Sequence, residues 1–235
     1  MAKEQDHTDS VRTVFDKWAD SGRGDTMAAG HEISARYALE QLGLQPGERF
    51  LDIGCGIGYS VRWAASYDET IQAYGVDVSE QMIERARTLS TDLPNARFIN
   101  SSFPLPILRA KSFHRILSIE AFYYFHDLPW AVLSTARLLA PGGLFACVVD
   151  FYEENVASHD WPDMVGVPLK RLSAQQWASV MTDIGLELVV QERIRHPLVE
   201  GEPPSWQQTE GSLLTIARRP LDEELDDDHN EIIAL

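Results

Sequence analysis

The sequence contains only two cysteines, Cys55 and Cys147, and no uninterrupted run of 18 apolar residues. Two thiols are too few for a structural zinc site, and their positions in a glycine-rich loop and a later strand do not favour a disulfide. A membrane-spanning helix needs about 20 consecutive apolar residues, so we expect none. The first residues are polar and lack the apolar core of a signal peptide, so we expect a cytoplasmic protein.

Basic residues are also scarce, with 20 lysines and arginines against 36 acidic residues and a net charge of −16. Residues 221–235 carry seven acidic residues and no lysine or arginine, which predicts a solvated, disordered tail. Because an acidic surface repels phosphate backbones, we do not expect a nucleic-acid substrate. A homodimer is compatible with the sequence, which does not determine the oligomeric state.

Several chemical signatures are missing as well. No P-loop, nucleophile elbow or redox cysteine pair is present, and no group of His, Cys and Asp has the spacing of a metal site. The sequence therefore predicts no bound metal.

The strongest positive signal is the stretch from Phe50 to Tyr59. An apolar run predicts a buried strand that ends in three glycines at alternate positions, Gly54, Gly56 and Gly58. A glycine-rich turn between a strand and a helix lets the backbone approach a ligand closely. The next predicted strand, residues 71–76, ends in Asp77, which is placed to accept hydrogen bonds from a ribose diol. The pattern predicts a cofactor that contains a nucleoside.

The glycine spacing favours one such cofactor. Dinucleotide-binding sites use G-x-G-x-x-G, whereas this chain has G-x-G-x-G with Asp52 two residues before the first glycine. The stretch Leu51-Asp-Ile-Gly-Cys-Gly-Ile-Gly58 resembles the first motif of class I S-adenosylmethionine (SAM)-dependent methyltransferases, in their UbiE-like (type 11) small-molecule branch. Asp77 and the turn Leu139-Ala-Pro-Gly-Gly143 strengthen the resemblance, which runs from about residue 47 to 217.

Alternating strand and helix patterns predict an α/β fold with a mostly parallel sheet and helices on both faces. The resemblance implies a Rossmann-like sheet of seven strands that ends in an antiparallel hairpin. We predict strands near 49–54, 71–76, 96–100, 113–119, 144–149, 186–194 and 211–217.

A single domain, 1–220, is expected. Within it we predict N-terminal cap helices (1–46), a SAM-binding core (47–150), a cap insertion (151–170) and the C-terminal part of the sheet (171–220). The second cap helix, near residues 32–42, should point Ile33, Tyr37, Ala38 and Leu42 inward.

The predicted site residues fall into two groups. The cofactor group follows the motif and its neighbouring strand ends, and Ser101 stands where the family commonly has an aspartate toward the adenine. Ordinary packing or capping is the alternative for several members, above all for Val78 and Met82. The cofactor group is Trp18, Asp52, Gly54, Cys55, Gly56, Gly58, Asp77, Val78, Met82, Ser101, Ser102, Phe103, Ile119 and Glu120. The candidate catalytic group is His31, Tyr124 and His126.

The resemblance implies transfer of a methyl group from SAM to a small-molecule acceptor by in-line displacement. A general base is needed only if the acceptor atom holds a proton of high pKa, and the sequence leaves the acceptor open among O, N, C and S. Two alternatives remain, namely a SAM-binding protein without catalysis and a nicotinamide-dependent oxidoreductase.

Overall fold

The structure is a computed structural model that describes residues 2–221, with side chains from residue 5 onward. The acidic tail predicted above lies almost entirely outside the described residues. Among these, no helix combines the length and the apolar character needed to cross a membrane.

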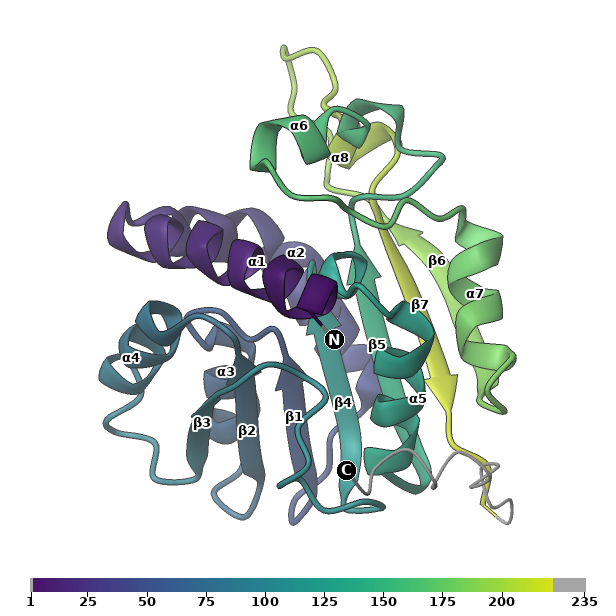
Figure 1. The fold of residues 1–235 in the computed structure, drawn as a ribbon. Helices are drawn as coiled ribbons and strands as arrows, with labels where there is room; N and C mark the ends of the chain where they lie inside the picture. The colour runs from purple at the N-terminus through teal and green to yellow at the C-terminus, as the bar shows by residue number, and fades with distance from the viewer. Residues whose placement is uncertain (1, 222–235) are drawn as a thin grey trace.

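One mixed sheet forms the centre of the molecule (Figure 1). Its strands lie in the order β3-β2-β1-β4-β5-β7-β6, with the first five parallel and β7 antiparallel to both β5 and β6. The predicted α/β fold with its antiparallel C-terminal hairpin is therefore confirmed. The strands are β1 (Arg49–Ile53), β2 (Gln72–Asp77), β3 (Ala96–Asn100), β4 (Phe113–Ile119), β5 (Leu139–Val149), β6 (Glu187–Ile194) and β7 (Ser212–Arg218).

Helices cover both faces of the sheet and the tips of the parallel strands. Apolar residues of α2, α3 and α4 pack on one face, whereas those of α5 and α7 pack on the other. In Figure 1, α1 crosses above the tips of the parallel strands, and α6 and α8 lie above β5 and β7. The helices are α1 (Ala2–Asp20), α2 (Arg23–Leu42), α3 (Tyr59–Tyr67), α4 (Glu80–Thr88), α5 (Leu128–Leu138), α6 (Trp161–Val165), α7 (Ala174–Thr182) and α8 (Trp206–Thr209), with short 3-10 turns η1 (Phe122–Tyr124) and η2 (Val156–Ser158).

The second N-terminal helix is longer than the sequence pattern predicts, because it begins at Arg23 and not near residue 32. Only Ser21 and Gly22 separate α1 from α2, because Gly22 turns the chain in the left-handed conformation with φ of 74°. The expectation that Ile33 points inward is wrong, since its side chain is 43% exposed. Ala38 and Leu42 are buried as expected, so the helix is confirmed but its inward face is narrower than predicted.

The predicted turn at Pro141–Gly143 lies inside β5 rather than before it. Phe113 and Arg115 of β4 pair with Leu139 and Leu144, so residues 140–143 form an extended bulge within the pairing. Gly142 N donates to Arg219 O and Arg219 N donates to Gly143 O, at 2.9 Å each. The bulge therefore keeps its backbone groups paired with the segment after β7, which explains why proline and glycine are tolerated here.

Candidate functional site

The three motif glycines all have positive φ, at 78°, 51° and 74°, but each serves the fold differently. A Cβ on Gly54 would lie 2.4 Å from the Ala121 Cβ, and one on Gly58 would lie 2.4 Å from the Phe98 ring. A Cβ on Gly56 would meet no atom within 4 Å. Gly54 and Gly58 are thus required by packing, whereas Gly56 faces open space at the ligand side of the loop.

Asp77 ties the glycine loop to the next helix. Its Oδ2 accepts from Gly56 N at 2.8 Å and its Oδ1 accepts from Ser79 N at 2.9 Å. Ser79 in turn caps α4 through its Oγ, which accepts from Met82 N at 3.1 Å. Burial raises the pKa of Asp77, and the two backbone N–H groups oppose this by lowering it. Asp77 is therefore an acceptor at the end of β2 and, through Ser79, also part of the cap at the start of α4.

Asp52 lies beneath the loop rather than beside its open face. Its carboxyl group accepts a short hydrogen bond from Ser60 Oγ, and the residue is buried, with a relative exposure of 2%. The pKa of Asp52 is raised to about 7. Burial is the largest cause; the hydrogen bond from Ser60 lowers the pKa, and the charge of Asp77 raises it. The structure thus orients Asp52 toward the start of α3.

A cavity lies above the strand tips, between the glycine loop and the N-terminal helices. Trp18, Asp52 and Gly58 do not line it, although Tyr59 beside Gly58 does. The remaining predicted site residues do: His31, Gly54, Cys55, Gly56, Asp77, Val78, Met82, Ser101, Ser102, Phe103, Ile119, Glu120, Tyr124 and His126.

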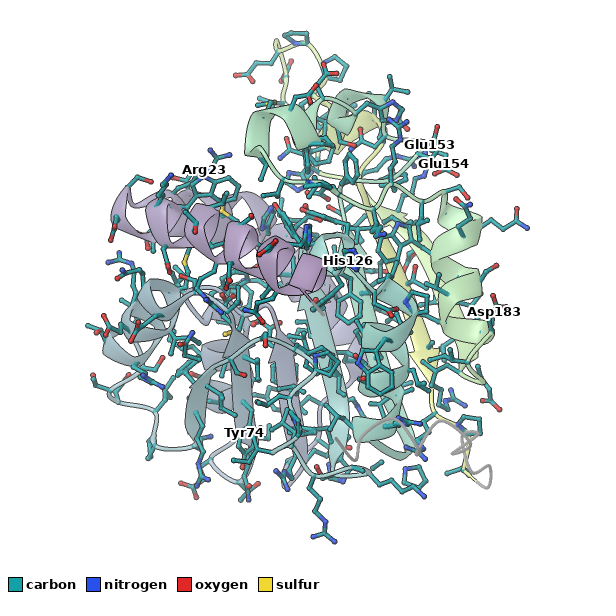
Figure 2. All side chains as sticks on the ribbon, in the orientation of Figure 1. Arg23, Tyr74, His126, Glu153, Glu154 and Asp183 are labelled. Carbon is teal, nitrogen blue, oxygen red and sulfur yellow. The ribbon has the colours of Figure 1, made fainter. Side chains whose placement is uncertain are left out.

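Trp18 instead packs within the N-terminal helices. The Arg23 guanidinium carbon lies 4.1 Å from the centre of its ring, and Phe15 meets it edge-on at 5.0 Å. Figure 2 shows Arg23 above the α1 ribbon. Phe15, about one turn earlier on the same helix, does line the cavity.

Sequence reasoning missed much of the α1 and α2 contribution to the cavity. His7, Thr8, Gly24 and Met27 line it, together with Val11 and Phe15. The role of Gly24 is visible only in the fold, because a Cβ there would lie 2.9 Å from Ile57 and 3.3 Å from the Met82 sulfur. The glycine allows α2 to approach the motif loop and is not a helix break.

Aromatic side chains form the cavity wall opposite the glycine loop. Tyr124 meets Phe15 edge-on at 5.2 Å, and its backbone oxygen lies 2.6 Å from the His7 ring nitrogen Nε2. The His7 and His126 rings lie 5.9 Å apart, and His126 sits beside the N-terminal end of α1 (Figure 2). This wall suits a flat or apolar acceptor, and its tyrosine hydroxyl and imidazoles offer polar contacts.

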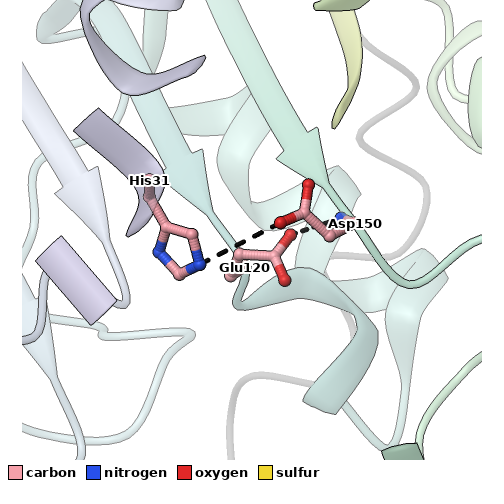
Figure 3. Close-up of side chains that lie close together, drawn as sticks. All are labelled: His31, Glu120 and Asp150. Carbon is pink, nitrogen blue, oxygen red and sulfur yellow. Dashed lines mark hydrogen bonds and ion pairs between the residues drawn. The ribbon is translucent and has the colours of Figure 1, made fainter. Parts of the chain in front are cut away.

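Two buried carboxylates and a histidine lie close together (Figure 3), and two of the three residues, His31 and Glu120, line the cavity. Glu120 follows β4 and Asp150 follows β5, and His31 reaches them from α2, with its Nε2 4.0 Å from Asp150 Oδ2. Glu120 Oε2 accepts from Tyr123 Oη at 2.7 Å, and its Oε1 accepts from Asp150 N. Glu120 holds a φ of 56°, a conformation unfavourable for a residue with a side chain.

Burial dominates the protonation of this group. It raises the pKa of Glu120 well above its ordinary value, and the neighbouring Asp150 raises it further. It also raises the pKa of Asp150, which the Ser212 hydroxyl lowers. For His31, burial and the nearby His196 lower the pKa to about 4. The imidazole is therefore neutral near pH 7 with a free lone pair.

Comparison with known proteins agrees with this geometry. The family described as "Methyltransferase domain" matches residues 51–147. A chain in the complex between the Haloferax volcanii Trm112 methyltransferase activator and a methyltransferase is 31% identical, with a TM-score of 0.81 over 88% of this chain and 97% of that chain.

The relatives include proteins with named activities. Cycloartenol-C-24-methyltransferase 1 of Oryza sativa is 27% identical over 87% of this chain, and 2-methyl-6-phytyl-1,4-hydroquinone methyltransferase of Synechocystis is 27% identical over 75% of it. The matches span 65% and 62% of those two proteins, so the chain covers somewhat less than two thirds of their length.

Proposed function

The chain belongs to the class I SAM-dependent methyltransferases, and from that premise we propose that it methylates a small-molecule acceptor in the cavity above the strand tips. SAM, when bound, supplies a methyl group on a sulfonium that is already activated for displacement at carbon. The protein then has to align the acceptor with that carbon and exclude water, which contributes about 7–11 kcal/mol in favourable cases.

The observation that carries this proposal is the open space in front of Gly56, next to Asp77. No protein atom lies within 4 Å of a Cβ built on Gly56, so a ligand has room there. Gly56 and Asp77 both line the cavity. The Asp77 carboxylate is fixed by two backbone N–H groups at the tip of β2, and its remaining lone pairs can accept from a ribose diol. We assign the cavity residues of the glycine loop and of the β2 and β3 ends to the cofactor, and Val78 and Met82 to its adenosine. Glu120, after β4, is assigned to the border between the methionyl end of the cofactor and the acceptor space.

The acceptor space lies between α1, α2 and the aromatic wall. We propose an apolar or aromatic acceptor, supported by Phe15, Tyr124, Phe125 and Trp130 in the lining. The named activities of the plant and cyanobacterial relatives, on cycloartenol and on a hydroquinone, are consistent with that class. His31, Tyr124 and His126 are our candidates for handling an acceptor proton.

Calorimetry with SAM, S-adenosylhomocysteine and NAD tests the cofactor, and methyl transfer from radiolabelled SAM to a metabolite panel tests the activity. We expect micromolar SAM binding, no NAD binding, and label in at least one apolar acceptor. NAD binding without SAM binding would favour an oxidoreductase, and SAM binding without labelled product would favour a non-catalytic protein.

We also propose a Trm112-type activator as a partner, because the Haloferax volcanii chain, which matches 88% of this one, was solved together with such an activator. Co-expression with a Trm112-type protein should yield a stable heterodimer on gel filtration. Separate elution would contradict this partner. The homodimer and the cytoplasmic location stay predictions, which light scattering and cell fractionation would test.

A further inference from the structure

His31, Glu120 and Asp150 form a cluster of potential metal ligands. The donor atoms of the three side chains all lie within 4.8 Å of one another. They come from α2 and from the ends of β4 and β5, so the fold converges three distant chain segments on one point (Figure 3).

Neither carboxylate has a lysine or arginine partner among the described residues. Glu120 is 7% exposed and Asp150 is 4% exposed. Within residues 5–221, no lysine or arginine forms an ion pair with either one, and Asp150 Oδ1 has no partner of hydrogen-bond geometry. A buried carboxyl group either holds a proton or is paired with a cation, and a metal ion bound by the three side chains would supply that cation here.

The donor set narrows the kind of cation. One imidazole and two carboxyl groups place their donor atoms within 4.8 Å of one another, and nitrogen and oxygen donors of this kind are ligands of divalent transition metals. In an octahedral site with metal–ligand bonds of about 2.0–2.2 Å, neighbouring donors lie about 3 Å apart and opposite donors about 4 Å apart. The 4.0 Å between His31 Nε2 and Asp150 Oδ2 falls in that range.

We propose that His31, Glu120 and Asp150 bind one divalent metal ion, of the Mn²⁺ or Zn²⁺ class, at the acceptor end of the cavity. A charge of +2 balances the two carboxylates. His31 and Glu120 line the cavity and Asp150 does not, so an ion held by all three side chains would lie at the cavity wall.

A role in the reaction follows, and this part rests on the proposed function. A metal at that wall would bind an acceptor oxygen and lower the pKa of its hydroxyl group, so that no strong protein base is required. The acceptor class would then be a hydroxylated small molecule, such as a phenol or hydroquinone.

The test uses the full chain, freed of metal by a chelator and dialysed, with Mn²⁺ and Zn²⁺ added alone. Mn²⁺ binding is followed by loss of the free-ion paramagnetic resonance signal, Zn²⁺ binding by calorimetry, and Mg²⁺ serves as a comparison that prefers all-oxygen sites. We expect one tight site per chain for Mn²⁺ or Zn²⁺, weakened about tenfold or more by Asp150→Asn and by His31→Gln.

Asp160→Asn is the matched control, because it removes the same charge from an exposed position at the start of α6. The Asp160→Asn variant should retain any weak, non-specific binding of cations to the acidic surface. If Asp150→Asn and His31→Gln bind the ions as the Asp160 variant does, or if the wild-type chain binds none tightly, the proposal is overturned.

SAM calorimetry on the same samples keeps the two proposals separate. Asp150 does not line the cavity, so Asp150→Asn should bind SAM as the wild type does while losing the metal. Loss of metal with SAM binding intact supports the site, whereas an absence of SAM binding in the wild-type chain contradicts the proposed function and leaves the metal result readable. If Asp150→Asn does not fold, His31→Gln decides the outcome. Among the described residues, the His31 side chain forms no hydrogen bond within α2, so this variant should fold.

Discussion

Replacement of Gly56 by alanine separates backbone strain from ligand contact. Gly56 holds φ at 51° and faces the cavity, with no protein atom within 4 Å of an added Cβ. The substitution therefore creates no collision inside the protein, and the only internal penalty is the left-handed conformation, about 1–2 kcal/mol for a residue with a Cβ. The new methyl group would stand in the space that we assign to the cofactor.

Gly43 supplies a control of nearly the same conformation. It caps the C-terminus of α2 with φ of 58°, has no atom within 4 Å of an added Cβ, and does not line the cavity. Gly43→Ala should therefore lose the same amount of unfolding free energy as Gly56→Ala, about 1–2 kcal/mol. Urea denaturation of both variants measures that loss.

SAM affinity should distinguish the two variants. Inserting a methyl group into a well-packed contact typically costs about 1–3 kcal/mol, so calorimetry should show SAM binding that is weaker by about fivefold to 150-fold for Gly56→Ala. Gly43→Ala should bind SAM as the wild type does. Equal dissociation constants for the wild type and Gly56→Ala, with both folded, would refute the close approach of cofactor to backbone.

Other consequences of the site can be measured in the same way. Asp77→Ala should weaken SAM binding by about 1–3 kcal/mol through lost charge-assisted hydrogen bonds, and unchanged calorimetry would contradict the ribose assignment. Gly58→Ala should lower the unfolding free energy by about 2–4 kcal/mol, more than Gly43→Ala, because its Cβ meets the Phe98 ring as well as backbone strain. Because the folded-state pKa of Asp52 is raised from 3.8 to about 7, the wild type should lose up to about 4 kcal/mol of stability as the pH rises from 4 to 8. Asp52→Asn should lose about 4 kcal/mol less than the wild type over the same pH interval, and an equal pH dependence of the unfolding free energy in the two proteins would argue against a raised pKa of Asp52.

The sequence predicted the parts of the site that depend on local order along the chain. The glycine loop, Asp77 and Glu120 each follow a predicted strand directly, and parallel strands bring their C-terminal ends to one edge. Knowing the strands was therefore enough to place these residues together. The structure adds why three glycines are needed, since the reasons lie in Ala121, Phe98 and the cavity, far away in sequence.

Contributions from the N-terminal helices are harder to predict. Glycine is a poor helix former, so a pattern containing Gly22, Gly24 and Gly30 suggests a break before residue 32. Tertiary packing overrides that propensity, because Gly24 permits contact with Ile57 and Met82.

The proposed metal ligands show a second limit of sequence reasoning. Spacing rules search for ligands that are close in sequence, whereas positions 31, 120 and 150 meet only after the sheet has formed. For the same reason, no pattern along the chain indicates that Asp52 turns toward Ser60 and away from the cavity.

The position of β7 between β5 and β6 has a consequence for how the protein is made. The only strand that pairs with β6 among the described residues is β7, which is synthesised after it. A ribosome-bound chain that stops short of Ser212 can assemble the parallel strands but must leave β6 unpaired and the edge of β5 open. Such an edge is a template for pairing with other chains, so nascent or truncated forms should be the ones that depend on chaperones.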